Sequence, residues 1–331
     1  MSKPIQYAVA CLAAVLWAAP APAVEHPGAD EFIQRAVTEF GLDAAEVESL
    51  LAQGDFKQSI VDAISRPAEA KPWHEYRPIF LNDRRISEGV AFWREHQELL
   101  DSVSKQYGVD PQIIVAIIGV ETLYGRITGG YRVLDALTTL GFYYPKDLKR
   151  DRSGFFSTEL MHFIKLGQEE DLPLNEVTGS YAGAMGMGQF IPSSYRAYAV
   201  DFDGNGRRDL WRSTADVVAS VANYLHVHGW RAGEPVSVPA EALPAADEAL
   251  AAPRDHKPAH SVGEIAQKGY HSLGDVDYAR PAAVLRLEES DRPSYWLTFD
   301  NFYVITRYNR SPLYAMAVLQ LSEEILRGMQ S

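Results

Sequence analysis

Apolar residues recur with helical spacing over most of this chain. Between residues 29 and 65 they return every three or four positions, which predicts short amphipathic helices. Asp43 precedes the second of these helices and Glu46 follows three residues later, so the pair predicts a capping box. Longer helical patterns follow at 87–107, 133–167, 217–228 and 312–327.

One stretch is apolar on every side. Residues 113–120 contain no polar side chain, and Asp110-Pro111 before them is a cap followed by proline at the first helical position. A β-branched run of this kind also permits a buried strand, but the proline start favours a helix. Such a helix is expected at the centre of a core.

The pattern changes after residue 231, where proline and alanine become frequent. Val236 and Val238 alternate with polar residues as a strand would, and 284–287 and 295–299 also read as short strands. We expect a mainly α fold (α+β): a lysozyme-like helical core, an N-terminal helical region and a small β-containing insertion. The predicted divisions are a signal peptide at 1–23, an N-terminal α region at 24–98, a catalytic core at 99–230, a β insertion at 231–300 and a C-terminal return to the core at 301–331.

Composition and charge narrow the class of protein. The 331 residues are 47% apolar and 23% charged, as in ordinary globular proteins. A net charge of −13 disfavours nucleic acid and anionic membranes as partners. No apolar stretch beyond the N-terminus is long enough to span a membrane. Protein partners cannot be inferred from the sequence.

The first residues have the features of an export signal. Lys3 precedes an apolar run at 8–19, and Ala21-Pro22-Ala23 fits a cleavage site, which predicts a periplasmic protein. Cys11 is the only cysteine, so the exported protein would have no disulfide and no thiol nucleophile. Lipid anchoring at Cys11 is the less favoured alternative, because Cys11 lies inside the apolar run.

Glu121 is the strongest candidate for chemistry. It ends the apolar run, and charged side chains are rarely buried without a partner. Apolar surroundings favour the protonated carboxyl, which suits a general acid. The alternative is a structural glutamate at a helix end, paired with Arg126 or Arg132.

Two further segments are suited to binding a neutral polar ligand. Residues 179–190 carry four glycines, which permit close backbone approach, beside the hydrogen-bonding side chains of Ser180 and Gln189. Residues 301–314 combine tyrosines with amides, which can contact sugars but also occur in protein cores. A tight turn between packed helices is the alternative for the glycine-rich segment.

A fourth segment has the spacing of a calcium loop. Asp201, Asp203 and Asn205 fall at positions 1, 3 and 5, Gly206 at position 6, and the Arg207 carbonyl at position 7. Position 12 is Arg212 rather than glutamate, although Asp216 could supply a late carboxylate. The sequence therefore predicts a structural Ca²⁺ site and no organic cofactor, with a metal-free polar turn as the alternative.

In their order, these four segments resemble the B-type lytic murein transglycosylases over nearly the whole chain after the signal. The similar stretches are 117–122, 179–195, 201–211 and 302–314. By this resemblance Glu121 is the catalytic glutamate and the 201–216 loop is an EF-hand-like calcium site, here one residue longer between Trp211 and Asp216. The residues implied to line the glycan cleft are Tyr76, Ser180, Gln189, Tyr224, Tyr308, Asn309 and Tyr314.

The resemblance also implies a reaction. Glu121 would protonate the glycosidic oxygen between N-acetylmuramic acid and N-acetylglucosamine in peptidoglycan, and would then deprotonate the muramyl 6-hydroxyl to close a 1,6-anhydro ring. A hydrolytic muramidase would need a second carboxylate, for which Asp135, Asp147 and Glu159 are available. A non-catalytic peptidoglycan-binding protein is the other alternative.

Overall fold

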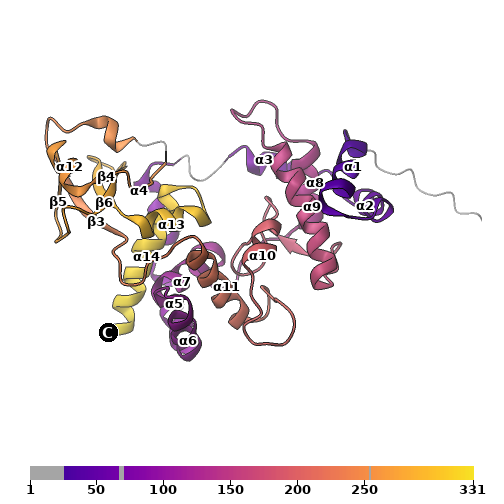
Figure 1. Cartoon of the computed structure of the whole chain (residues 1–331), viewed down its shortest axis with the longest axis horizontal. Coiled ribbons are helices and arrows are strands. Elements are labelled where there is room, and N and C mark those ends of the chain that lie inside the picture. The colour runs from indigo at the N-terminus through magenta and orange to yellow at the C-terminus, as the bar shows by residue number, and fades with distance from the viewer. Residues whose placement is uncertain (1–25, 67–70, 253–254) are drawn as a thin grey trace, which may run out of the picture.

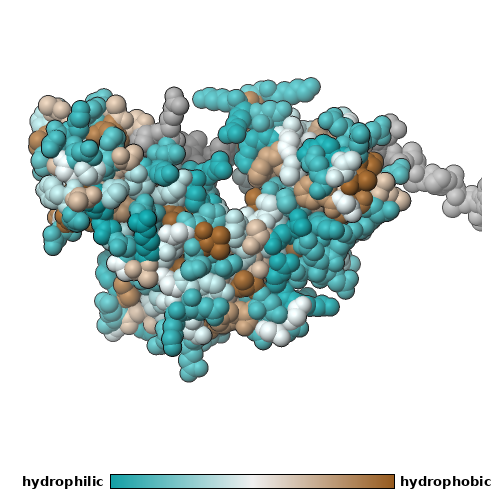
Figure 2. Space-filling model, viewed as in Figure 1, coloured by the Kyte–Doolittle hydropathy of each residue, from teal (hydrophilic) through white to brown (hydrophobic). Residues whose placement is uncertain are grey.

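The computed structural model describes residues 26–66, 71–252 and 255–331. The predicted signal peptide and Cys11 lie outside these residues. The molecule is elongated, with a β-sheet near one end and the first two helices near the other (Figure 1). Its surface is hollowed between these two ends, on the side seen in Figure 2. No helix among the described residues is both long and apolar enough to cross a membrane.

The predicted N-terminal helices are confirmed as α1 (Ala29–Phe40), α2 (Ala44–Leu51) and α3 (Gln58–Ile64). The Asp43 side chain accepts the Glu46 N–H at 3.0 Å, which is one half of the predicted capping box. The Glu46 side chain instead accepts the Gln168 amide at 2.7 Å, so the reciprocal half is not formed. α1 packs against α2 and α9, and α3 packs against α8.

The prediction of a single helix from residue 87 to 107 is wrong. The structure has α5 (Asp83–Glu95) and α6 (Gln97–Tyr107), which follow α4 (Trp73–Phe80) and are separated at His96. His96 has φ −114° and ψ 27°, outside the helical region, and its ring packs edge-on against Phe92 at 4.6 Å. Neither glycine nor proline marks this break, so periodicity alone does not reveal it.

The buried helix is α7 (Pro111–Thr122), in which Ile113 to Val120 are all buried, as predicted. It packs against α5, α6, α11 (Thr214–Val227) and α14 (Pro312–Gln330). A second group of helices, α8 (Val133–Phe142), α9 (Ser153–Glu170) and α10 (Pro192–Tyr198), packs in sequence order. The strands β1 (Tyr131–Arg132) and β2 (Thr178–Gly179) pair in a two-stranded antiparallel sheet. Gly179, at the end of β2, is the first residue of the glycine-rich segment.

The strands expected after residue 231 form one antiparallel sheet in the order β4-β6-β7-β3-β5. They are β3 (Ser237–Ala242), β4 (His260–Ser261), β5 (Tyr270–Ser272), β6 (Pro281–Leu287) and β7 (Ser294–Thr298), with α12 (Val262–Gln267) and a short 3₁₀ turn, η2 (Glu248–Ala251), beside them. Val284 and Val238 both pair with Leu297, and these residues belong to a core separate from the helical one. Leu285 and Leu287 instead belong to the main core, so the sheet is fixed to the helices.

The chain enters and leaves this sheet region at one point. Asn301, on α13 (Asp300–Tyr308), is fully buried. Its Oδ1 accepts the Arg231 N–H at 2.8 Å, and its Nδ2 donates to the carbonyls of Arg231 at 2.8 Å and Glu234 at 3.0 Å. The start and the end of the region are therefore joined by a single amide.

Candidate active site

Glu121 lies on the last turn of α7, where the backbone makes an unusual end. Leu123, Tyr124 and Gly125 all have positive φ, at 50°, 56° and 83°. Tyr124 folds back so that its hydroxyl donates to the Arg85 carbonyl at 2.8 Å. A Cβ on Gly119 would lie only 2.5 Å from that hydroxyl, so glycine is required there. This packing holds the last turn of α7, and with it Glu121, in one conformation.

Tyr314, near the start of α14, donates a hydrogen bond from its hydroxyl to Oε1 of Glu121 at 2.6 Å. Burial, and then the nearby Glu121 carboxylate, raise the pKa of Tyr314 well above its usual value of 10.0, so its hydroxyl stays protonated as a donor. The arginines of the alternative interpretation pair elsewhere: Arg126 with Glu88 at 2.9 Å, and Arg132 with Asp135.

The glycine-rich segment is hydrogen-bonded to Thr122, the residue after Glu121. Thr122 donates from Oγ1 to the Met187 carbonyl at 2.8 Å, and the Met187 N–H donates to the Leu210 carbonyl at 2.8 Å. Gln189 has φ 50°, and its Nε2 donates to the carbonyls of Thr128 and Gly186. Ser180 accepts the N–H groups of Ala182 and Ala184 at Oγ. These side chains therefore shape the loop beside Glu121.

The tyrosines of the candidate cleft form a packed group. The Tyr308 hydroxyl donates to the Gly188 carbonyl at 2.6 Å, and the Tyr224 hydroxyl donates to the Arg307 carbonyl at 2.6 Å. The two ring centroids are 4.8 Å apart. Burial, followed by the Glu121 carboxylate, raises the pKa of Tyr308 well above its usual value, so its hydroxyl stays protonated as a donor to Gly188.

Three of the candidate cleft residues are less accessible than their predicted role implies, and Tyr224 is the most exposed of them at 8%. Tyr76 is 1% exposed and stacks on Trp73 at 6.2 Å, and Tyr314 is 2% exposed. Tyr76 is also one of the groups that raise the pKa of Tyr314, after burial and Glu121. Tyr76 and Tyr314 are therefore buried in the protein rather than exposed on an open face. Asn309 follows α13 and accepts the Ser311 N–H at 3.2 Å.

Two of the three carboxylates considered as a second catalytic group have structural partners. Asp135 accepts the Asp55 N–H at 2.9 Å and pairs with Arg132. Glu159 accepts the N–H and the hydroxyl of Ser193 at 2.9 and 2.7 Å, at the start of α10. Asp147 is exposed, in the segment between α8 and α9.

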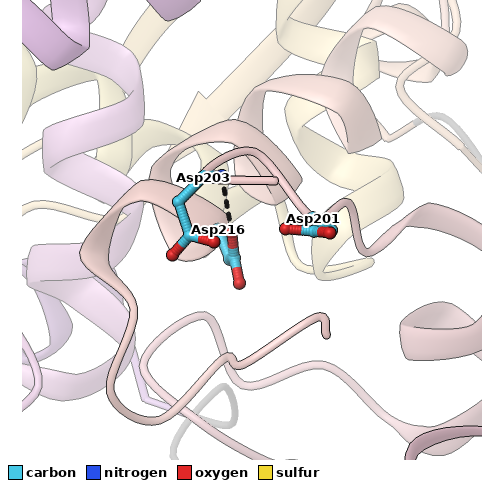
Figure 3. Close-up of side chains that lie close together, drawn as sticks. All are labelled: Asp201, Asp203 and Asp216. Atoms are coloured by element: carbon cyan, nitrogen blue, oxygen red, sulfur yellow. Dashed lines mark hydrogen bonds between the residues drawn. The ribbon is translucent and has the colours of Figure 1, made fainter. Parts of the chain in front are cut away.

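The 201–216 loop brings three carboxylates together (Figure 3). One oxygen from each of Asp201, Asp203 and Asp216 lies within 4.8 Å of the other two. Oxygens bound to one Ca²⁺ at 2.3–2.6 Å have separations up to about 5 Å, so the set fits this ion. Asp216, which sequence reasoning placed beyond the standard pattern, is fully buried and accepts the Phe202 and Asp209 N–H groups at 2.8 and 2.9 Å.

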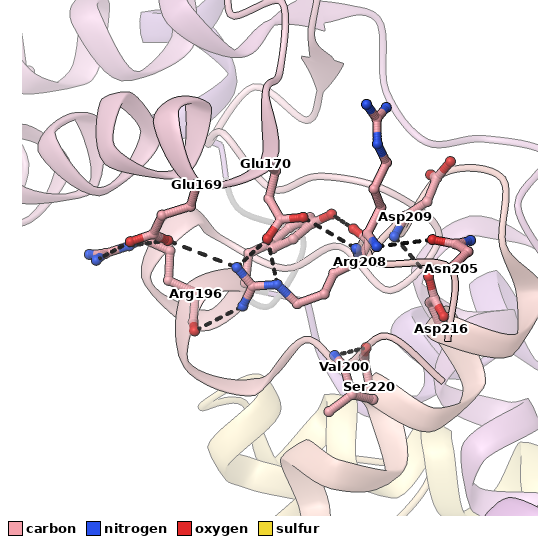
Figure 4. Close-up of polar contacts among 11 residues, drawn as sticks. Glu169, Glu170, Arg196, Val200, Asn205, Arg208, Asp209, Asp216 and Ser220 are labelled. Atoms are coloured by element: carbon pink, nitrogen blue, oxygen red, sulfur yellow. Dashed lines mark hydrogen bonds and ion pairs between the residues drawn. The ribbon is translucent and has the colours of Figure 1, made fainter. Parts of the chain in front are cut away.

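Hydrogen bonds fix the loop to its surroundings (Figure 4). Arg208 donates from Nε to Glu170 at 2.6 Å, and its side chain lies 3.9 Å from Glu169. Tyr195 donates to the Arg208 carbonyl, and Ser220 on α11 accepts the Val200 N–H at 2.9 Å. The loop is thus attached to α9, α10 and α11 by side chains on both sides.

Sequence reasoning missed the residues that hold Glu121 in place. Thr122 adjoins a conspicuous glutamate and Tyr124 adjoins Gly125, but their partners lie far away in the sequence, at Met187 and Arg85. The only local signal was the glycine at position 119 inside an otherwise bulky apolar run.

Residues 25–323 match the family described as the transglycosylase SLT domain. The chain is 40% identical over 311 residues to membrane-bound lytic murein transglycosylase B of Escherichia coli K12, covering 91% of this chain and 83% of the relative. The soluble lytic transglycosylase SltB1 of Pseudomonas aeruginosa superposes with a TM-score of 0.82 at 47% identity, over 92% of this chain and 100% of that one. The E. coli lytic transglycosylase Slt35, solved in complex with calcium, gives a TM-score of 0.82 at 37% identity, over 94% and 96%. This chain belongs to the transglycosylase SLT family, among its lytic murein transglycosylases with a lysozyme-like fold.

Proposed function

We propose that this lytic transglycosylase uses Glu121 as its single acid/base to cleave the β-1,4 bond between N-acetylmuramic acid and N-acetylglucosamine in peptidoglycan. The observation that carries the proposal is the hydrogen bond from Tyr314 to Glu121 at 2.6 Å, on a helix end fixed by its own backbone. A carboxyl group that is only partly exposed and oriented by a phenol is suited to transfer a proton twice in one cycle.

The reaction needs one carboxyl group in two roles. Glu121 first gives its proton to the glycosidic oxygen, so that the bond to the muramyl carbon breaks. The acetamido group of the substrate stabilises the cationic carbon. The Glu121 carboxylate then removes the proton of the muramyl 6-hydroxyl, whose oxygen closes the 1,6-anhydro ring. Glu121 ends protonated, as it began, and no water is consumed.

The surrounding residues bind the glycan. Ser180, Gln189 and Asn309 hold backbone segments on both sides of Glu121, and Tyr224 and Tyr308 pack where the glycine-rich segment meets α13. Glycines at 186 and 188 let the backbone present its polar groups closely, because no side chain intervenes. Tyr314 orients the carboxylate through its hydrogen bond, and Tyr76 packs nearby against Trp73 and Phe80 as one of the groups that raise the pKa of Tyr314.

Product analysis tests this mechanism. Purified sacculi digested with the enzyme should yield muramyl ends that are one water lighter than hydrolytic ends, as measured by mass spectrometry. Glu121→Gln keeps the size of the side chain but removes the transferable proton, so a folded variant should lose about 10²–10⁴-fold in rate or more. Reducing ends would favour the hydrolytic muramidase. Sacculi left intact by the unmodified protein would favour a non-catalytic binder.

We also propose that the 201–216 loop binds a structural Ca²⁺ through Asp201, Asp203, Asn205, the Arg207 carbonyl and Asp216. The clustering of the three carboxylates supports it, as does the solved calcium complex of the similar E. coli enzyme. Hard oxygen ligands suit this ion. The ion would stabilise the loop and its attachment to α9 and α11 without taking part in catalysis.

The proposed place of action is the periplasm. It is supported by the murein substrate in the name of the E. coli relative and by the export pattern at residues 1–23 of the sequence.

A further inference from the structure

A second hollow lies on the sheet, apart from the residues around Glu121. It has a volume of about 790 Å³ and is lined by residues 239–242, Leu273 and residues 289–296. The lining belongs to β3, the start of β7 and the turn between β6 and β7. None of these residues has a part in the proposed reaction.

An aromatic residue, Trp296, forms part of the wall of this hollow and is only partly buried. Its neighbour Tyr295 also borders the hollow, but adjacent residues of a strand point to opposite faces of the sheet, and the Tyr295 ring packs against Tyr270 in the smaller core at 5.4 Å. Leu273 on its border is 66% exposed. A partly exposed indole in a concave site offers a flat apolar face with an N–H at its edge, which suits stacking on the ring of a sugar.

Three charged side chains at the same hollow, those of Glu241, Asp291 and Arg292, are exposed and form no hydrogen bond or ion pair with another described residue. Glu289 accepts the Ser294 hydroxyl at 3.1 Å. The three carboxylates offer acceptors for sugar hydroxyls, and Arg292 offers a donor for an acetamido carbonyl.

The hollow is held rigidly to the catalytic helices. Leu285 and Leu287 of β6 are part of the main core, and the His74 N–H donates to the Glu288 carbonyl at 3.1 Å. His74 lies on α4, which also carries Tyr76. A strand bound on the sheet would therefore be kept at a fixed position relative to Glu121.

We propose that this hollow, defined by Glu241, Asp291, Arg292 and Trp296, is a second glycan-binding site for β-1,4-linked N-acetylhexosamine strands. The inference rests on the proposed function, since it assumes that the substrate is a polymer with many such strands. Binding one strand here would raise the local concentration of neighbouring strands at Glu121, and two linked sites bind more tightly than either alone.

The test uses the full chain with Glu121→Gln, so that sacculi stay intact during binding. Asp291→Ala, Arg292→Ala and Trp296→Ala, each added to this background, should weaken binding to sacculi at least about tenfold. Asp101→Ala and Arg150→Ala, which change exposed residues of the same types elsewhere, should not. Because Asp291 and Arg292 have no partners, their variants keep the fold even if Trp296→Ala loses stability. Unchanged binding by both turn variants would overturn the proposal.

A soluble probe locates the site. Chitotetraose, four β-1,4-linked N-acetylglucosamines, should shift the NMR signal of the Trp296 indole N–H, and Trp296→Tyr should keep most of the affinity for sacculi. Shifts confined to the glycine-rich segment would contradict the proposal. In the catalytically intact protein, Arg292→Ala should slow the digestion of sacculi but not of short soluble glycans. Failure of the Glu121 assignment would appear separately, as cleavage by the Glu121→Gln variant.

Discussion

The Tyr314 hydroxyl lies 2.6 Å from Oε1 of Glu121 and joins the first turn of α14 to the last turn of α7. The two residues are 193 positions apart in sequence, so the carboxyl of the proposed acid/base is oriented by a helix near the other end of the chain. The contact makes the geometry of the site dependent on the packing of α14 against α7.

Tyr314→Phe should lower turnover while leaving the fold intact. A hydrogen bond to a charged group contributes about 1.5–3 kcal/mol, which corresponds to a loss of about 10–100-fold in kcat if the bond acts in the transition state. Steady-state rates on sacculi and a melting curve measure both properties. Tyr278→Phe, at a tyrosine that is 58% exposed, is the matched control. Normal kcat in a folded Tyr314→Phe would remove Tyr314 from the mechanism.

Calcium should raise the melting temperature, and chelation should lower it. If the ion binds only the folded state, an excess of about 100-fold over Kd adds roughly 2.7 kcal/mol to the free energy of unfolding. Asp201→Ala should abolish the response to calcium, whereas Asp101→Ala should keep it. Asp201 also accepts the Gly204 and Gly206 N–H groups, so the informative quantity is the change on adding calcium. Identical melting curves with chelator and with calcium would show a metal-free turn.

Glu159→Gln should leave glycan cleavage intact, because the carboxylate caps α10 through Ser193. Burial raises the pKa of Glu159 above its usual value of 4.5. A group whose pKa is raised in the folded protein adds to the free energy of unfolding at pH values below its unfolded pKa. This contribution is lost as the pH rises through the folded pKa. The variant should therefore gain stability relative to the unmodified protein as pH increases above about 4.5. Melting temperatures across this range measure the trend, and loss of cleavage would revive the two-carboxylate muramidase.

Gly129→Ala and Gly130→Ala should differ sharply in melting temperature and activity, although the two glycines are neighbours in sequence. Gly129 has φ 94°, and a Cβ there would lie 2.1 Å from the Gly179 carbonyl oxygen, at the start of the glycine-rich segment. The conformation alone costs a non-glycine residue about 1–2 kcal/mol, and the contact forces a backbone shift. At Gly130 nothing lies within 4 Å of the added carbon. Gly129→Ala should lower both the melting temperature and the activity, and equal behaviour of the two variants would refute this.

Local patterns in the sequence predicted the features that depend on nearby residues. The apolar run identified α7, the proline after Asp110 identified its start, and the alternation of Val236 and Val238 indicated a strand. The spacing of Asp201, Asp203 and Asn205 predicted the loop in which the carboxylates of Asp201, Asp203 and Asp216 cluster. Each of these patterns is set by residues within a single helix, strand or loop, so it can be recognised from neighbouring positions in the sequence.

Features that depend on distant packing could not be predicted this way. The break at His96 has no glycine or proline. The spacing of the calcium pattern could not place the Asp216 carboxylate, because its position depends on how α11 packs against the loop. The anchors of Glu121, including Tyr124 on Arg85 and Thr122 on Met187, join segments 39 and 65 residues apart.

The buried amide of Asn301 has a consequence for how such a protein can change over evolutionary time. It joins the start of the sheet region, at Arg231 and Glu234, to the start of α13 at its end. In a segment closed at its base in this way, the outer loops can be lengthened or shortened while α11 and α13 keep their positions, as long as Leu285 and Leu287 of β6 stay in the main core. New ligand preferences can then arise on the sheet without remodelling the site that breaks the bond.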